Sequence, residues 1–419
     1  MINNEEIIFC KKCLYGSSHP LGLTFNDEGI CSGCEIHEEK YNLDWKGRFQ
    51  KLKKLVKIYK LKSNKNYDCI IPVSGGSDSY WILHIVKNKL KLNPLLVSYN
   101  KYFNTDLGIR NLSNLRIKFD CDILIQNVNP ISVKKITRTT FRNLGSIYWP
   151  CIAGQTVFPV QTAVDLKIPL IIWGGHQGVE QTGMFSHENE VEMTRRYRKD
   201  HDLMGYEADN LLNFFDTLNE EDIWQYRYPD DLDLKRIGVR GIYLSNYIPW
   251  DPKKQDESMI KKFNFKTSKN HRSFETYDHV DCYNYFDTHD LLKLFKHGYS
   301  KVTDHACREI RHRRLDRAYA QSLVLNYEKK QLKYISQFCE WLNIDMTAYN
   351  FLIDLHRNKK YWRLLDWNEK KWKFKGWSKL RKIKKNKLQN VERKLNFISN
   401  DKLNGNKLIK YYIIGKGYP

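Results

Sequence analysis

The chain has 419 residues, of which 41% are hydrophobic and 13% aromatic, so it is not a disordered protein and is long enough for two to four domains. It has no apolar run of the about 18 residues that cross a bilayer and no secretory signal pattern at its start, so we expect a cytoplasmic protein. The net charge of +22 first suggests a nucleic-acid partner, but 19 of the 70 Lys and Arg residues and only 4 of the 48 Asp and Glu residues follow position 357, which argues against one.

The predicted elements alternate between strands and helices over the first half of the chain. Helices are predicted over residues 45–62 and 80–90. Four short apolar runs predict buried strands at 67–73, 94–99, 122–126 and 168–173. This alternation predicts an α/β fold with a doubly wound parallel sheet. Beyond about Glu180 the strand rhythm stops, and a mostly helical stretch is predicted from His289 to about Leu355.

These patterns divide the chain into four predicted parts. They are a cysteine-bearing module at 1–45, an α/β domain at 46–215, a helical region at 216–357 that covers the mouth of the sheet, and a basic tail at 358–419. The tail carries tryptophans at every fifth position, namely Trp362, Trp367, Trp372 and Trp377. We interpret the tail as a solvated extension with partial order, although basic residues among tryptophans also suit peripheral contact with an anionic membrane surface or with a nucleic acid.

Two Cys-x-x-Cys pairs lie near the N-terminus, Cys10 with Cys13 and Cys31 with Cys34. This spacing is typical of a tetrahedral site in which four thiolates bind zinc. Four sulfur ligands leave no position for a substrate, so the predicted Zn²⁺ is structural; an iron–sulfur cluster and four free thiols are the alternatives. Cys31 also fits the Gly-x-Cys-x-Gly pattern of glutaminases, but a turn precedes it where a glutaminase needs a buried strand, so we expect no glutaminase here.

A serine–glycine loop follows the first predicted strand, with the sequence Ser74-Gly-Gly-Ser-Asp-Ser79. A Gly-rich turn at the start of a helix brings backbone N–H groups and the positive end of the helix dipole to an anion. The loop resembles the PP-loop of the ATP pyrophosphatases, which implies ATP binding through all six residues: Ser74, Gly75, Gly76, Ser77, Asp78 and Ser79. Asp78 could also hold Mg²⁺. In that fold the adenine lies near the end of the next strand, which implies Ser98 and Tyr99, and the crevice would include Gly174 and Gly175 after the fourth strand.

A second charged motif lies at residues 298–311. Four of its side chains share one face of a predicted helix because they are spaced at i, i+3, i+7 and i+10: Lys301, Asp304, Arg308 and Arg311. Lys301 and Arg311 are predicted to neutralise phosphate charge during the reaction, and Asp304 and Arg308 to contact phosphate or substrate. The alternative is a solvated charged face.

One histidine follows the fourth strand, in Gly174-Gly175-His176. A histidine at the carboxyl end of a parallel strand could act as a general base for incoming ammonia, so His176 is a candidate catalytic residue. The alternative is a polar loop on the surface.

Taken in order, the two cysteine pairs, the serine–glycine loop, residues 241–251 and the motif at 298–311 resemble the N-acetyl sugar amidotransferase family of bacterial surface-polysaccharide and nonulosonic acid pathways. The resemblance covers about residues 8–350 and leaves the tail outside. It implies that the acetamido group of a nucleotide-activated N-acetyl sugar is adenylated by ATP and that ammonia then displaces AMP to leave an acetamidino group. It also implies partners: a separate glutaminase and a cyclase-like ammonia channel. The family pattern has an acidic residue after the glycine of the fourth strand, a place that Glu180 could take here.

Two other functions fit parts of the sequence. A PP-loop enzyme that modifies tRNA, of the thiolase or lysidine-synthase type, is favoured by the cysteine pairs and the basic charge. It is disfavoured by the absence of a second central cysteine pair in the sequence pattern. A non-catalytic relative whose tail binds a partner or membrane is disfavoured by the intact serine–glycine loop.

Overall fold

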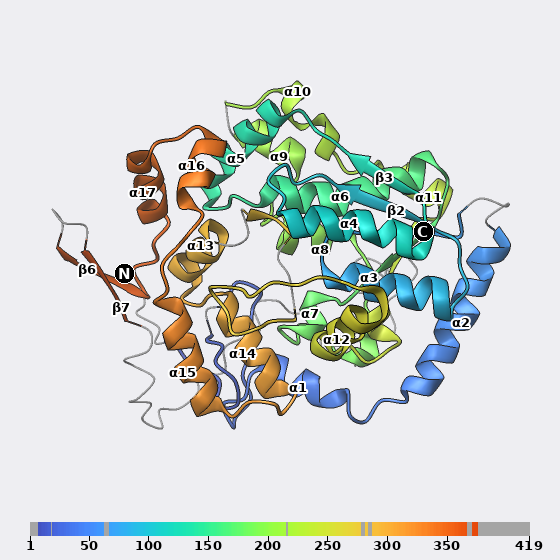
Figure 1. The fold of residues 1–419 in the computed structure, drawn as a ribbon, viewed down its shortest axis with the longest axis horizontal. Helices are drawn as coiled ribbons and strands as arrows, with labels where there is room; N and C mark the ends of the chain where they lie inside the picture. The colour runs from blue at the N-terminus through green and yellow to red at the C-terminus, as the bar shows by residue number, and fades with distance from the viewer. Residues whose placement is uncertain are drawn as a thin grey trace.

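The computed structural model describes residues 7–17, 19–62, 67–214, 217–277, 281–283, 287–366 and 371–375, and its centre is a five-stranded parallel sheet (Figure 1). The strands are β1 (Cys69–Pro72), β2 (Pro94–Tyr99), β3 (Ile123–Gln126), β4 (Leu170–Trp173) and β5 (Arg240–Tyr243), in the order β3-β2-β1-β4-β5. All neighbouring pairs are parallel, which confirms the predicted parallel sheet. The strand order reverses between β1 and β4, and such a reversal opens a crevice at the carboxyl ends of these two strands.

The four predicted strands are present, but β3 is not buried as predicted: it lies at the edge of the sheet, where Leu124 and Ile125 are exposed. The prediction that strands end near Glu180 is also wrong. β5 pairs with β4 in register, Ile171 opposite Gly241 and Ile172 opposite Ile242. The first two residues of β5 are Arg240 and Gly241, so the strand has no continuous apolar run, and the sequence pattern did not predict it. The sheet therefore continues into the range 216–357 that was assigned to the helical region.

Each face of the sheet packs against its own layer of helices. In β1, Cys69 and Ile71 join a core with α2 (Trp45–Lys62), α3 (Ser77–Leu83), α4 (Asp106–Phe119) and α12 (Pro252–Phe263). Ile70 points to the other face and packs with α6 (Trp149–Asp165) and α11 (Asp231–Ile237). Side chains alternate between the faces of a strand, so strands buried on both sides read as continuous apolar runs.

The predicted helix over 45–62 is confirmed as α2. The helix predicted over 80–90 begins earlier, at Ser77, and its second half, His84–Lys89, is wound as a wider π-helix. The remaining helices before α12 are α1 (Ser32–Glu39), α5 (Pro130–Leu144), α7 (Gln177–Glu180), α8 (Arg195–Tyr197), α9 (Ala208–Phe214) and α10 (Glu220–Ile223).

The predicted helical stretch is present as five helices, which in Figure 1 lie together beside the α/β layers. They are α13 (Thr288–His297), α14 (Lys301–Arg311), α15 (Arg317–Glu328), α16 (Ile335–Leu342) and α17 (Met346–Leu355). Gly298, in the left-handed region with φ of 76°, ends α13, and Ser300 begins α14 through a capping box with Thr303. This short turn sets the position of α14.

The start of the tail, which was interpreted as a solvated extension with partial order, is folded. An antiparallel hairpin, β6 (Trp362–Asp366) and β7 (Lys371–Phe374), packs through Trp362 against Phe295 of α13. Trp367, Trp377 and the residues beyond 375 lie outside the described part, and so does the predicted membrane contact of the tail. Among the helices that the structure describes, none has both the length and the apolar character that crossing a bilayer would need.

Candidate active site

The serine–glycine loop, residues 74–79, follows β1 at the point where the strand order reverses. The Ser74 N–H donates to Ser79 Oγ at 2.9 Å, and the Gly76 N–H donates to Ser74 Oγ at 3.1 Å. These two bonds close the loop on itself, so its shape is set before any ligand arrives. Gly75 has to be glycine because a Cβ there would lie 2.4 Å from the Gly108 carbonyl oxygen of α4.

Two cavities meet at Ser74. The central cavity, of about 510 Å³, lies between the loop, α7, α14 and the loop before α12. The strand-end cavity, of about 500 Å³, lies at the carboxyl ends of β2 and β3 and against α4. Lys101 and Asp281 also line both, so the two cavities are neighbours across the loop.

The residues predicted to bind ATP divide between these cavities. Gly75, Ser98 and Tyr99 line the strand-end cavity, whereas Asp78 and Gly175 line the central cavity. Gly76, Ser77, Ser79 and Gly174 line neither of the two. Gly174 and Gly175 instead give room to the Trp250 ring, since a Cβ on either would come within 2.9 Å of it.

Asp281 is a residue of the site that the sequence did not single out. Its Oδ2 accepts the Gly75 N–H at 3.1 Å, and its Oδ1 pairs with Lys101 Nζ at 2.6 Å. A carboxylate therefore already lies against the loop at one of the N–H groups that an anion would use. Lys101 is buried, and the neighbouring Asp281 charge raises its pKa against the opposing effect of burial.

The charged face of α14 lies on the central cavity, and all four predicted side chains line it. Lys301 is at the first turn, where its backbone N–H donates to Asp290 at 2.6 Å. Arg308 pairs with the buried Glu275, and Asp304 accepts from Tyr15 Oη at 2.7 Å and pairs with Lys293. The spacing of these residues thus brings them to one cavity, as the helical pattern predicts.

Arg311 is held between the end of α7 and the N-terminal module. Its guanidinium donates to the Gln181 carbonyl at 2.6 Å, to Cys34 Sγ at 3.5 Å and to Cys31 Sγ at 3.7 Å. The side chain is 3% exposed, so its charge acts mainly on these thiol groups. Its predicted role at phosphate stays a prediction, and this position does not favour it.

His176 is buried and lines neither the central nor the strand-end cavity. Its Nδ1 accepts the Gly178 N–H at 3.0 Å as the N-cap of α7, and its ring packs on Tyr197 and Tyr243. Burial lowers its pKa to about 3. The catalytic role predicted for His176 stays a prediction that this position does not favour.

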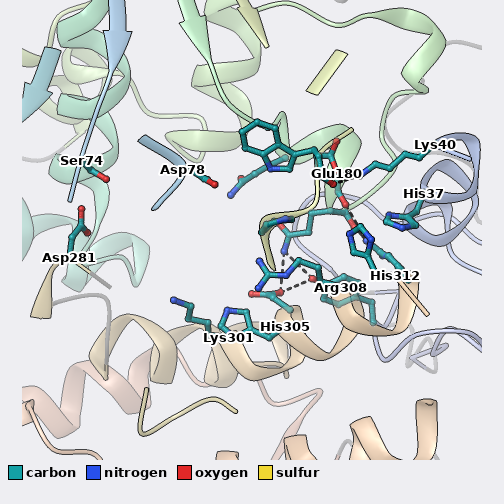
Figure 2. Close-up of a pocket in the computed structure, with 18 of the residues that line it drawn as sticks. His37, Lys40, Ser74, Asp78, Glu180, Asp281, Lys301, His305, Arg308 and His312 are labelled. Atoms are coloured by element: carbon teal, nitrogen blue, oxygen red, sulfur yellow. Dashed lines mark hydrogen bonds and ion pairs between the residues drawn. The ribbon is translucent and has the colours of Figure 1, made fainter. Parts of the chain in front are cut away.

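His305 is the histidine on α14 that lines the central cavity (Figure 2). Its Nδ1 lies 2.6 Å from Ser273 Oγ and 3.2 Å from the buried Glu275 carboxylate. These contacts fix the orientation of the ring. His305 lies within the motif at 298–311, but only the fold brings Glu275 and Ser273 to it.

Glu180 also lines the central cavity, where it pairs with Lys40. Burial raises its pKa, and the Lys40 charge opposes this rise. An acidic side chain is therefore present on this side of the cavity, although not at the position directly after the β4 glycines.

The four cysteines of the N-terminal module are fully buried and form a cluster in which all four sulfur atoms lie within 4.8 Å of one another. Cys10 Sγ and Cys34 Sγ are 4.0 Å apart, and Cys13 Sγ and Cys31 Sγ are 3.6 Å apart. Zinc–sulfur bonds of about 2.3 Å in a tetrahedron place sulfur atoms about 3.8 Å apart, so the cluster fits zinc. The Arg311 guanidinium would offset part of the negative charge of four thiolates.

This cluster shares one hydrophobic core with α14. Leu14 and Tyr15 pack with Val302, Ala306 and Ile310, and the Leu14 N–H donates to Cys307 Sγ at 3.4 Å. The module also supplies Tyr15, His37 and Lys40 to the lining of the central cavity. The cysteine cluster thus holds one wall of the site.

Comparison with known proteins gives a family match for the part of the chain that contains α14. Residues 258–381 match the family model described as LPS biosynthesis protein WbpG-like, C-terminal domain. This range includes Asp281, α13, α14 and the hairpin, and excludes the serine–glycine loop. It runs past residue 357, which corrects the expectation that family resemblance ends before the tail. The match connects this part of the chain with lipopolysaccharide biosynthesis.

One curated relative is an archaeal protein without an assigned activity. The chain is 31% identical over 121 residues to the uncharacterized protein MJ1599 of Methanocaldococcus jannaschii. The similar segment is 28% of this chain and 42% of that protein, so it spans less than half of the relative's length.

Proposed function

We propose that this protein is an ATP-dependent, AMP-forming amidotransferase that converts the N-acetyl group of a nucleotide-activated sugar into an acetamidino group for surface-polysaccharide synthesis. One observation carries this proposal: the serine–glycine loop and the charged face of α14 line the same cavity. The family match of residues 258–381 supports the pathway.

In this proposal the adenosine of ATP lies in the strand-end cavity, beside Ser98 and Tyr99, and the phosphates lie along the serine–glycine loop. Ser74 lines both cavities, so the α-phosphorus would face the central cavity. Asp78 and Asp281 are the carboxylates next to the phosphates and would hold Mg²⁺, which neutralises phosphate charge when bound. The hydrogen bond from the Gly75 N–H to Asp281 would have to break before this N–H could donate to a phosphate oxygen.

The chemistry needs activation because an amide carbon is a poor electrophile. The acetamido oxygen attacks the α-phosphorus, pyrophosphate leaves, and an O-adenylyl imidate forms. Ammonia adds to the imidate carbon and loses a proton to a base, and AMP leaves with the former acetamido oxygen. Lys301 and Arg308 would stabilise the phosphate charge, and His305, held by Glu275, would take the proton. Ammonia would come from a separate glutaminase through a channel partner.

The tRNA-modifying alternative has less support. A thiolase needs an accessible nucleophilic cysteine, and the central cysteines Cys151 and Cys282 are both buried and line neither cavity. A hydrogen bond between the Cys151 and Cys282 thiols, together with burial, raises the pKa of Cys151, which keeps it protonated and unreactive.

Mass spectrometry of the products tests the proposal. The full chain is incubated with ATP, Mg²⁺, an ammonium salt and UDP-, GDP-, CMP- and dTDP-linked N-acetyl sugars. We expect one sugar to become lighter by the difference between an oxygen atom and an NH group, with one AMP released per product. Asp78→Ala should abolish AMP release while the protein stays folded. ADP and phosphate in place of AMP, or no lighter sugar, would contradict the proposal.

A further inference from the structure

A third cavity lies next to the central cavity and shares Trp250 with it. This aromatic cavity, of about 720 Å³, lies between the start of α2, the helix formed by α3 and its π-wound extension, and α12. Four large aromatic side chains line it: Tyr41, Trp45, Trp81 and Trp250. The indole Nε1 of Trp81 is buried and has no hydrogen-bond partner among the described residues, so it is a donor without an acceptor.

The aromatic cavity carries excess positive charge. Lys89, Lys254 and Lys262 line it, and among the described residues only Lys254 has an ion pair, with Asp251 at 3.8 Å. Arg314 holds the same Asp251 carboxylate at 2.9 Å, which leaves little of its charge for the cavity. Burial, then the Lys262 and Lys89 charges, lower the pKa of His84 on the cavity wall. Cations without matching anions, beside flat aromatic rings, suit a ligand with phosphates and a base.

The aromatic cavity adjoins the central cavity. His37, Lys40, Trp250 and His312 line both. Figure 2 shows His37, Lys40 and His312 across the central cavity from Ser74 and Asp281, which lie at the loop. The aromatic cavity shares no lining residue with the strand-end cavity. A ligand in it would therefore reach the central cavity from the side opposite to the adenosine.

We propose that the aromatic cavity binds the nucleoside diphosphate of the sugar substrate, with its base stacked on the tryptophans and its phosphates at Lys89 and Lys262. This inference rests on the proposed function and names the part of the site that recognises the carrier. The attached sugar then passes Trp250 and Lys40 into the central cavity, where its N-acetyl group meets the α-phosphorus of ATP. Two nucleotides thus occupy two separate sites at the same time.

Equilibrium binding with UDP, GDP, CDP, dTDP and ADP as probes tests this inference on the full-length protein. The variant is the double charge reversal Lys89→Glu with Lys262→Glu, because both side chains are exposed and the fold does not depend on them. The matched control is Lys261→Glu, an exposed neighbour on α12 that does not line the cavity. We expect at least one of the four non-adenine diphosphates to bind the double variant at least about 30-fold more weakly than it binds the wild type. Its affinity for the control variant should equal its affinity for the wild type. Affinity for MgATP should stay within about threefold.

Each other outcome overturns the inference. If the double variant and the wild type bind all four non-adenine diphosphates equally, or if neither binds any, the cavity is not the carrier site. If only ADP binding is lost, the cavity holds a second adenine nucleotide. Failure of the proposed function would give a different result. One diphosphate would still need Lys89 and Lys262 to bind, but the corresponding nucleotide sugar would release no AMP. That result would support the binding site and contradict the reaction.

Discussion

Gly75 is the point where the serine–glycine loop comes closest to α4. A methyl group there would meet the Gly108 carbonyl at 2.4 Å, whereas the nearest atom to a methyl group on Gly76 is the movable Ser74 Oγ at 3.3 Å. We therefore predict that Gly75→Ala lowers the free energy of unfolding by about 1–3 kcal/mol and weakens ATP binding about tenfold or more.

Gly76→Ala is the matched control and should change both quantities much less. Denaturant unfolding and titration with a fluorescent ATP analogue measure the two effects. Equal effects of the two substitutions would show that the contact with α4 does not shape the loop.

We predict different effects on turnover for substitutions of His305 and His176. His305 lines the central cavity and is oriented by Glu275, while His176 is buried as a helix cap. We expect His305→Asn to lower turnover with ammonium about 100-fold or more and to leave MgATP affinity intact. His176→Asn, whose side chain can still cap α7, should leave turnover nearly unchanged. The steady-state rate of AMP formation measures both effects. A larger loss of turnover in His176→Asn than in His305→Asn would indicate that His176 is the base.

At the scale of elements, the cysteine cluster and α14 form one structural unit. Losing the metal should loosen α14, because Leu14, Tyr15 and Arg311 connect the two directly. We predict that Cys13→Ser lowers zinc content and lowers the free energy of unfolding by about 3 kcal/mol or more, with faster amide exchange in α14 than in α5.

Cys121→Ser is the control, since Cys121 is half-buried and lies outside the cluster. It should keep the zinc and the exchange rates of the wild type. A zinc-free Cys13→Ser protein with normal stability and normal exchange in α14 would refute the structural role of the cluster.

The hairpin at the start of the tail belongs to the folded body. Trp362 covers Phe295, and the Arg357 guanidinium lies 4.9 Å from the Trp372 ring centre. Deleting residues 358–419 should therefore lower the free energy of unfolding by about 2–3 kcal/mol, whereas deleting 382–419 keeps the hairpin. Thermal unfolding of the two truncations measures the difference, and equal midpoints would show that the hairpin does not stabilise α13.

At the scale of the whole molecule, buried histidines should make stability depend on pH. Burial, then the Lys40 and Arg48 charges, lower the pKa of His187 to about 3, and neither ring nitrogen has a hydrogen-bond partner among the described residues. The folded chain therefore stays unprotonated at His187 while the unfolded chain takes up a proton near pH 6.5. Acidification favours unfolding, and from about pH 7.5 to about pH 5 His187 should cost about 2 kcal/mol of stability.

His187→Leu removes this titration and should reduce the acid loss by about that amount. Denaturant unfolding at the two pH values, with zinc content followed in parallel, measures it. The same acid loss in the variant and the wild type would show that His187 is not the buried neutral group.

The sequence predicts the parts of this molecule that depend on local pattern. Continuous apolar runs predict β1 to β4, and the helical spacing of Lys301, Asp304 and Arg308 predicts their common face. β5 was missed because it begins with Arg240 and Gly241, so only two of its residues, Ile242 and Tyr243, carry the apolar pattern of a buried strand. The binding of Arg311 to the cysteine cluster was missed because it joins residues 277 positions apart. Asp281 and Glu275 reach the site only through the packing of long connecting segments, which carry no periodic signal.

The central claim, that ATP activates an acetamido oxygen by adenylation, is tested most directly by an isotope. The N-acetyl sugar found active is prepared with ¹⁸O in its acetamido group and turned over with ATP, Mg²⁺ and an ammonium salt. We predict that the ¹⁸O leaves with AMP, in its phosphate, at one label per acetamidino product. Label in free phosphate, or label kept in the sugar while ATP is consumed, would contradict it.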